Sequence, residues 1–349
     1  MPVITISALD TFYFRDGKPF QMGEDTISSG IFPPFPSVLY GILRSAYFAE
    51  NMDEFSLRNI AEDPTKALKI TQICLKNESN ELLFPLPNDL ITAEDESLHL
   101  LKLEENTLIS STITPMILSS PIAGKTQSNA GNYLSLSALN RYLNTPNLPI
   151  ALTNIQSALS TDSKIGIGRN TATHTAEEGK LYRINFQRLK GKTGENTHEI
   201  SLCVEYDGIA IAEKGLLRVG AEGKGASYAL LEPEIQTQVS CPALTRNRFK
   251  MYVSSPAIFM EGWLPKFLFN AEGITLLTAA MGKPVSIGGY DMKTQTPKVM
   301  NKAVSGGSVY YLEAETQEKA QDFAKKYHGT SLSDKYKEQG FGIVYFGNI

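Results

Sequence analysis

The N-terminal residues alternate in the way that a half-buried strand requires. Ile4 and Ile6 occupy every second position of VITISA, and the segment is rich in β-branched side chains. We expect a first strand from residue 3 to about Phe14. The stretch IFPPFPS follows a polar segment and carries three prolines within four positions, which excludes a helix or a central strand there.

A helical periodicity begins directly after these prolines. The apolar stripe consists of Leu39, Ile42, Leu43 and Ala46. Ser37 suits the N-cap of this helix, and Tyr40 and Arg44 fall on its other side. A helix N-terminus offers unpaired N–H groups and partial positive charge, so this start is suited to a phosphate.

Further along, strand patterns outnumber helical ones. Residues 69–76 read as a strand, 133–143 as a short helix, and SKIGIGRN and LYRINFQRL as the two arms of a hairpin. The last hundred residues contain several strands, a short helical segment at 275–282 and a helix that ends at Gly329. The mixture predicts an α+β fold, and 349 residues predict two domains.

Charge is unevenly distributed although its total is small. The net charge is −4, from 33 Lys and Arg against 37 Asp and Glu, which argues against a generic nucleic-acid binder. Residues 50–106 hold 5 basic and 13 acidic side chains, whereas residues 241–310 hold 8 basic and 3 acidic ones. The first block is either a solvated insertion or a surface for a basic partner, and the second is either a solvated face or a phosphate-binding surface.

The three cysteines and the N-terminus bear on localisation. Cys74, Cys203 and Cys241 are odd in number and far apart, and the chain does not start with a basic region followed by an apolar one. No apolar stretch reaches the length of a membrane span. We therefore expect a cytoplasmic protein with free, buried thiols and no membrane association.

Sequence signatures of common catalytic sites do not occur. The four histidines form no HExxH pair and there is no CxxC, so we expect neither a metal site nor a cofactor. Gly124, Lys125 and Thr126 imitate the end of a P-loop, but Ser119 stands where that motif needs glycine. His174, in a polar loop, remains a candidate general acid or base, although a lone loop histidine more often only binds.

Six segments, taken in order, resemble one known family. They are FYFRDGKPFQMGED, FPPFPSVLYGILRSAY, IGIGRNTATHTAEEGKLY, LRVGAEGKG, PVSIGGYD with PKVMNKAVSGGSVYYLE, and GFGIVYFG. Together they resemble the RAMP superfamily of CRISPR proteins, and within it the third Cmr-type subunit of type III-B effector complexes. The resemblance covers the chain except for the acidic region from about 50 to 130.

The resemblance implies a fold, a function and partners. It implies two ferredoxin-like, RRM-related domains, 1–215 and 216–349, the first with the acidic insertion at about 50–130 and a protruding thumb-like hairpin at about 161–190. It implies a non-catalytic, RNA-binding subunit in antiviral defence that holds the crRNA 5′ handle and contacts the Cas10-type large subunit and other Cmr subunits.

Candidate RNA contacts follow from the resemblance and from the side chains that suit RNA. Arginine binds phosphate with a planar fork, glycine lets the backbone approach closely, and loop residues of the hairpin suit bases or sugar hydroxyls. The candidates are Arg15, Lys18, Ser37, Tyr40, Arg44, Arg169, Asn170, His174, Lys224, Gly288, Gly289, Tyr290 and Lys298.

A second interpretation stays open. A metal-independent endoribonuclease of the same superfamily would process crRNA precursors with His174 as general acid or base. The chain shows no convincing Tyr or Lys partner for that histidine, so the binding interpretation is favoured.

Overall fold

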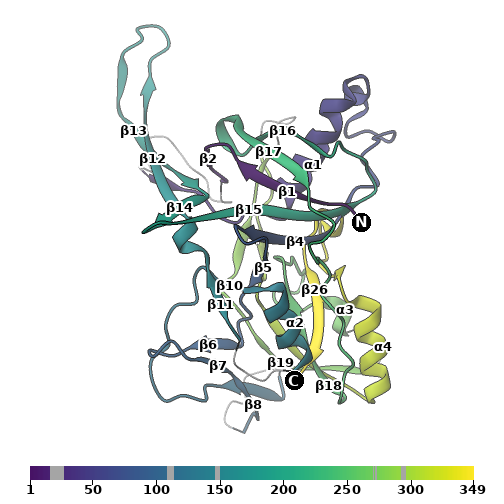
Figure 1. Cartoon of the computed structure of the whole chain (residues 1–349). Helices are drawn as coiled ribbons and strands as arrows, with labels where there is room; N and C mark the ends of the chain where they lie inside the picture. Colours follow the sequence, from purple (N-terminus) through teal and green to yellow (C-terminus); the bar gives the residue numbers. More distant parts are fainter. Residues whose placement is uncertain (16–26, 108–113, 146–149, 270, 272, 292–295) are drawn as a thin grey trace.

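The computed structural model describes residues 1–15, 27–107, 114–145, 150–269, 271, 273–291 and 296–349. Two large sheets make up most of the structure, and a long hairpin projects from the first (Figure 1). The helix α1 (Pro36–Glu50) packs on the N-terminal sheet, and α4 (Gln317–Tyr327) packs on the C-terminal sheet. The predicted α+β class is confirmed.

The N-terminal sheet has nine strands in the order β11-β10-β5-β4-β15-β1-β17-β16, with β14 paired to β15. They are β1 (Val3–Ala8), β4 (Lys69–Asn77), β5 (Leu82–Pro85), β10 (Asn132–Ser135), β11 (Leu152–Asn154), β14 (Lys190–Thr193), β15 (Asn196–Asp207), β16 (Lys214–Val219) and β17 (Lys224–Leu230). The first predicted strand is therefore present, although it stops at Ala8 and resumes as β2 (Thr11–Phe12) in the hairpin sheet.

The C-terminal sheet has five strands in the order β19-β24-β18-β26-β25. They are β18 (Arg248–Val253), β19 (Ile274–Ala280), β24 (Val309–Ala314), β25 (Thr330–Ser331) and β26 (Ile343–Asn348). Four of these strands, β19-β24-β18-β26, repeat the arrangement β4-β15-β1-β17 of the N-terminal sheet. When the strands of each set are numbered along the chain, the first lies between the third and the fourth, and the second pairs with the third. All these pairs are antiparallel.

Two local predictions are wrong. Residues 275–282 were expected to be helical, but β19 covers most of them, because pairing with β24 outweighs the helix propensity of Leu and Ala. Ser37 does not cap α1: Phe35 is the N-cap and makes no side-chain cap, while Pro36 takes the first helical position. The apolar stripe of α1 is confirmed, since its four residues are buried against the N-terminal sheet.

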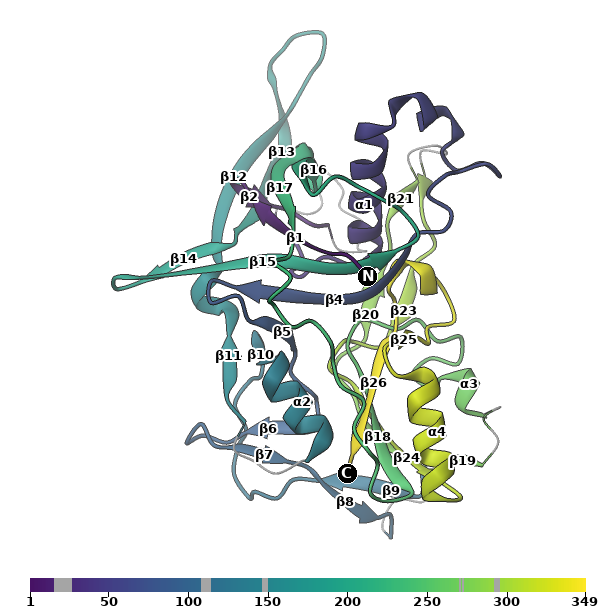
Figure 2. The same cartoon turned by 45° about the vertical axis from the view of Figure 1, so that its right-hand side comes forward.

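The sheet faces opposite α1 and α4 pack against each other. Val3, Cys74 and Cys203 of the N-terminal sheet share a core with three C-terminal tyrosines, and α2 (Leu136–Asn144) joins that core (Figure 2). The tyrosine hydroxyls donate across this joint: Tyr252 to the Pro85 carbonyl at 2.6 Å, Tyr345 to Gln72 at 2.9 Å, and Tyr311 to Asp89 at 2.8 Å.

The domain boundary predicted after residue 215 is wrong, because it cuts β16, which pairs with β17 inside the N-terminal sheet. The link between the sheets is residues 231–247. The supposed insertion at 50–130 is also interrupted, since β4 and β5 lie within the sheet. Three elements of residues 50–130 lie outside the sheet. They are the 3₁₀ helix η1 (Met52–Leu57), a small hairpin of β6 (Leu90–Thr92) with β7 (Leu98–Leu100), and a second one of β8 (Lys102–Glu105) with β9 (Met116–Ser119).

The predicted hairpin is present, as β12 (Ser160–Arg169) and β13 (Ala176–Arg188). β2 and β3 (Ile27–Ser29) pair with β13, so the hairpin base is tied to the N-terminus. Two further short pairs form an arm on the C-terminal unit: β20 (Val285–Ile287) with β23 (Asn301–Ala303), and β21 (Tyr290–Asp291) with β22 (Thr296–Pro297).

Two remaining expectations concern thiols and membranes. Cys74 and Cys203 are free and buried as expected, but Cys241 is exposed. Among the described residues, no helix is both long and apolar enough to cross a membrane.

Candidate nucleic-acid interface

The tip of the hairpin is a backbone-ordered, solvent-exposed turn. The Asn170 side-chain oxygen accepts the amides of Ala172 and Thr173 at 2.9 and 3.1 Å, and His174 takes a positive φ of 57°. Arg169 reaches the His174 carbonyl at 3.4 Å. Because the rings and cations at this tip face solvent, three predicted residues, Arg169, Asn170 and His174, lie together in position to meet a ligand.

Two lysines meet at the base of the hairpin. Lys164 of β12 and Lys224 of β17 place their ammonium groups 4.7 and 4.9 Å from the ring centre of Phe186. Glu222 lies 3.7 Å from Lys164 and 3.5 Å from Lys224, so one carboxylate orients both cations. The buried Phe186 ring holds the pair in place, and Lys164 remains well exposed. The predicted Lys224 thus belongs to the same surface as the hairpin.

The glycine-rich loop is packed closely on the start of the chain. Gly220 has a φ of 70°, and a Cβ added there would lie 2.5 Å from the Tyr13 carbonyl oxygen. The Ala221 amide donates to that same oxygen at 3.0 Å. This close approach sets the exposed Arg15, two residues after Tyr13, beside the loop that leads to Lys224. Lys18 lies outside the described residues.

A second group of predicted residues gathers around the start of α1. Phe35 packs with Ile287 of β20 and Ala303 of β23 in a small apolar cluster. The cluster brings the arm of the C-terminal unit to the first turn of α1, where Ser37 and Tyr40 lie half-buried. Burial raises the pKa of Tyr40, against the opposing charge of Arg44. Its phenol therefore stays protonated at neutral pH.

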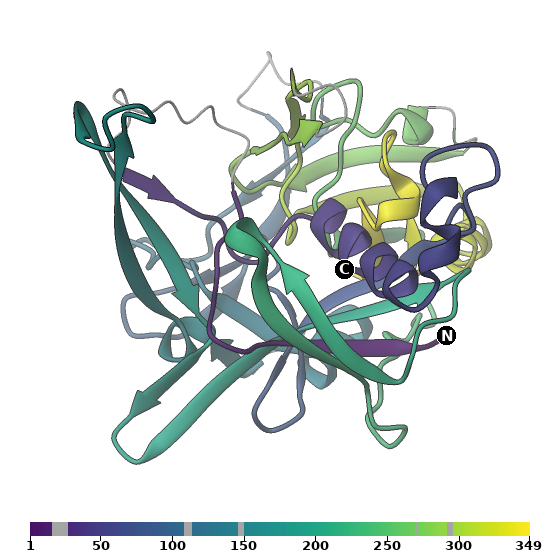
Figure 3. The same ribbon diagram turned by 90° about the horizontal axis from the view of Figure 1, so that it is seen from above.

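The arm itself carries the remaining predicted residues. The Lys298 amide donates to the Gly289 carbonyl at 2.9 Å, which closes the β21–β22 pair and leaves the Lys298 side chain exposed. Gly288 lies beside it, and Tyr290 begins β21. Seen from above, the hairpin and this arm lie toward the same side of the molecule (Figure 3).

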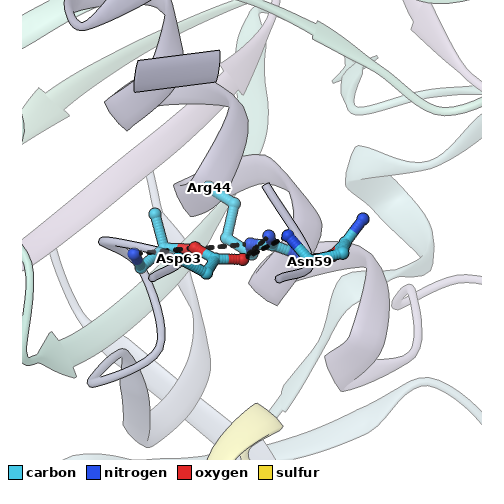
Figure 4. A network of polar contacts seen from close by, with 4 residues as sticks. Arg44, Asn59 and Asp63 are labelled. Atoms are coloured by element: carbon cyan, nitrogen blue, oxygen red, sulfur yellow. Dashed lines mark hydrogen bonds and ion pairs between the residues drawn. The ribbon is translucent and has the colours of Figure 1, made fainter. Parts of the chain in front are cut away.

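Arg44 has a different environment from the one expected. Its guanidinium donates to Thr65 at 2.7 Å, to Asn59 at 3.0 Å and to Asp63 at 2.6 Å (Figure 4). Burial raises the pKa of Asp63, but hydrogen bonds from Thr65 and the Asn59 amide, with the charge of Arg44, outweigh it and leave the pKa below its usual value. These contacts give Arg44 a structural role, and its phosphate contact stays a prediction.

The faces of the two sheets are closed to a ligand. RRM domains bind bases on aromatic side chains of the helix-free sheet face. Here the corresponding tyrosines, Tyr252, Tyr311 and Tyr345, are 3% exposed or less and lie in the joint between the sheets. Among the described residues, the exposed hairpin, the glycine-rich loop and the arm therefore remain the candidate contacts for an extended ligand.

Lys164 and Phe186 were missed by sequence reasoning. Lys164 and Phe186 lie in the hairpin strands and Lys224 lies in β17, so only the packing of the hairpin against β17 brings the three side chains together. Among the described residues, no group of three or more His, Cys, Asp or Glu side chains is placed to hold a metal ion.

The fold combines two sheets of repeated strand order with a projecting hairpin. A family model described as "CRISPR-associated protein (Cas_Cmr3)" matches residues 4–349. The chain belongs to this family.

Solved structures agree with the fold. One, described as "Cryo-EM structure of the Type III-B Cmr-beta bound to cognate target RNA and AMPPnP, state 1", is 17% identical over 93% of this chain and 88% of its own, with a TM-score of 0.52. A second, "Cryo-EM structure of the Type III-B Cmr-beta bound to cognate target RNA", is 19% identical over 88% and 86%, also with a TM-score of 0.52. No curated protein matches.

Proposed function

We propose that this CRISPR effector subunit is a non-catalytic RNA-binding protein that holds the crRNA 5′ handle and contacts a Cas10-type large subunit and other Cmr subunits in the cytoplasm. The observation that carries the proposal is the lysine pair, Lys164 and Lys224, fixed over Phe186 at the base of the hairpin. Two oriented cations beside a projecting hairpin suit the phosphates of a single strand that the hairpin covers.

The family and the fold support the proposal. The two similar structures are of assemblies bound to target RNA, so RNA and other subunits are the partners we propose here. The repeated strand order, with α1 after the first strand of one sheet and α4 after the third strand of the other, supports two ferredoxin-like units. The predicted contacts of Arg15, Lys18 and the arm remain part of the proposal.

The test is binding of labelled crRNA with an intact or a scrambled 5′ handle to the full chain, alone and with its Cas10-type partner. Replacing both lysines (Lys164→Gln with Lys224→Gln) is expected to weaken handle binding roughly 10-fold and to lower the salt-dependence slope by about 1.4, near 0.7 per lost phosphate contact. Lys325→Gln with Lys326→Gln, two exposed lysines of α4, is the matched control and should change neither value.

An equal loss in both double variants would mean that only net charge matters, and equal binding of both RNAs would refute handle recognition. The same samples on a denaturing gel test the endoribonuclease interpretation. Among the described residues, no side chain hydrogen-bonds the His174 ring: the His174 amide donates to the Asn170 carbonyl, and the His174 carbonyl accepts from Arg169. Cleavage without metal that disappears in His174→Ala would replace our proposal.

A further inference from the structure

Tyr336 has an unusual combination of backbone and side chain. Its φ of 58° and ψ of 36° lie in the left-handed region, yet the residue is 40% exposed. Glycine and asparagine favour this conformation, because a Cβ crowds the neighbouring carbonyl. Glycine takes the same region at Gly340, and Tyr336 is the only residue with a phenol ring among the non-glycine residues described at positive φ: Asn59, Asn80, Glu96, His174, Glu222 and Tyr336. The chain accepts strain to place an aromatic ring at this position, which is typical of functional sites.

The surrounding turn fixes the ring. The Gln339 amide donates to the Tyr336 carbonyl at 3.0 Å, and the Ser333 hydroxyl donates to the Lys335 carbonyl at 2.8 Å. One side of the Tyr336 ring packs against Phe341 with 5.9 Å between ring centres, and Phe341 is fully buried. The rest of the ring faces solvent. A pre-positioned ring of this kind loses little freedom when a ligand binds.

Cations lie on the turn that carries the ring and on the arm to which this turn is tied. Lys335 reaches across to Asn301 of β23 with 2.8 Å between Nζ and Oδ1, which ties the turn to the arm. Lys337 and Lys298 are exposed on the two segments. Of the acids in the turn, Asp334 accepts the Met260 amide at 2.8 Å, which leaves Glu338 as the exposed carboxylate there. Among their described residues, the turn and the arm together carry four lysines (Lys298, Lys302, Lys335 and Lys337) against three acidic residues (Asp291, Asp334 and Glu338), so positive charge is in slight excess.

The same arm exposes apolar side chains next to these lysines. Val299 is 82% exposed and Met300 is 42% exposed, and the Val299 carbonyl accepts from Asn301, the residue that Lys335 holds. Apolar surface, a rigid ring and lysines on one patch match the flat faces and the phosphates of an unpaired strand. Duplex RNA would not fit, since its bases are already stacked.

We propose that Tyr336 binds a nucleobase of single-stranded RNA by stacking, with Lys337 and Lys298 contacting the adjoining phosphates. This site rests on the proposed function and adds to it a base-contacting residue outside the hairpin and the glycine-rich loop. It also explains why the arm of the C-terminal unit and the start of α1 are held together by the cluster of Phe35, Ile287 and Phe341. The RNA path then extends from the hairpin base to this turn.

The experiment uses the full chain with its Cas10-type partner and crRNAs that carry the fluorescent base 2-aminopurine at one handle position at a time, since stacking quenches its emission. Tyr336→Phe keeps the ring, Tyr336→Leu keeps apolar bulk without it, and Tyr336→Gly removes both the ring and the strain. We expect the emission of 2-aminopurine at one handle position to be quenched by the wild type and by Tyr336→Phe, and not by Tyr336→Leu or Tyr336→Gly. Handle affinity should fall roughly 10-fold in the latter two. The Gly variant should melt at a higher temperature than wild type, which separates lost binding from lost folding.

Each other result overturns the site in a distinguishable way. If wild type binds the handle RNA and all variants bind equally, Tyr336 is not a contact while the proposed function stands. If wild type does not bind, the proposed function fails together with the site. If the Leu and Gly variants bind RNA normally but lose the Cas10-type partner, the patch is a protein-docking surface and the stacking site is refuted.

Discussion

The two sheets share a strand order but differ in what fills their connections. In the C-terminal unit, α4 connects the third strand to the fourth and packs back on the sheet. In the N-terminal unit the same connection has no α-helix and carries β16 and the glycine-rich loop instead. The second-to-third connection is long in both: residues 78–195 include the hairpin, and residues 281–308 include the arm.

This difference shows where the molecule has surface available for a partner. The sheet faces opposite α1 and α4 are buried in the joint between the units, where α2 also packs, and the other two faces are covered by α1 or α4. The candidate contacts therefore lie on connections, and the hairpin and the arm arise from the same connection of the repeated pattern. The joint is a buried core that the two units share, and we expect it to hold these connections at a fixed spacing.

The largest expected effect comes from breaking the joint. Gly347 of β26 lies against α2 so closely that an added Cβ would be 2.6 Å from the Leu143 carbonyl oxygen. Gly347→Ala must push α2 away, and we expect a loss of about 3 kcal/mol in the free energy of unfolding, measured in urea. Gly41→Ala is the control: nothing lies within 4 Å of that Cβ on α1, so stability should rise by about 0.5–1 kcal/mol.

If the joint couples the units, Gly347→Ala shifts one cooperative transition. Two separated transitions, of which only one shifts, would show that the units unfold independently and that the joint does not hold the hairpin and the arm at a fixed spacing.

A buried amine distinguishes the C-terminal side of the joint. Lys250 of β18 is fully buried, its Nζ has no hydrogen-bond partner among the described residues, and it lies 3.4 Å from the Tyr142 ring centre. Burial lowers the pKa of Lys250 to about 8, against the attraction of Asp89. Lys250→Met should therefore raise the free energy of unfolding at pH 7 by about 2 kcal/mol.

The sign follows from proton uptake. As pH falls from the ordinary lysine pKa of 10.5 toward 8, the unfolded chain binds a proton that the folded chain does not, so wild-type stability falls through this window and is level below it. The Met variant should lack that slope in urea titrations between pH 7 and 10. Lys214→Met, at an exposed position, should behave as wild type, and an unchanged slope in Lys250→Met would mean that the amine is not the titrating group.

Local patterns in the sequence predicted those elements whose partners are near in the chain. The stripe of α1 and the alternating hairpin strands were correct, because periodicity alone decides which side faces a core. The helix expected at 275–282 failed because β19 is defined by its pairing with β24, and the boundary after residue 215 failed because β16 pairs with β17, which joins the N-terminal sheet through the distant β1. For the same reason Lys224 was found but its neighbours Lys164 and Phe186 were not. Tyr336 carries no signal at all until its backbone is known.

The smallest expected effect concerns the paired cation of the N-terminal unit, the counterpart of the unpaired Lys250. Arg44 holds residues 51–65 to α1 through Asp63, so Arg44→Met and Asp63→Asn should each cost about 1 kcal/mol, and the double variant little more than either. The pKa of Asp63 is lowered in the folded state, so its contribution is present above pH 3.8 and is lost as pH falls through the lower folded value. Wild type should therefore lose stability more steeply than Asp63→Asn in acid.

RNA binding separates the two roles of Arg44. If Arg44 only braces this segment, both variants bind the handle equally, whereas a phosphate contact would weaken binding in Arg44→Met alone, because Asp63→Asn leaves the guanidinium in place.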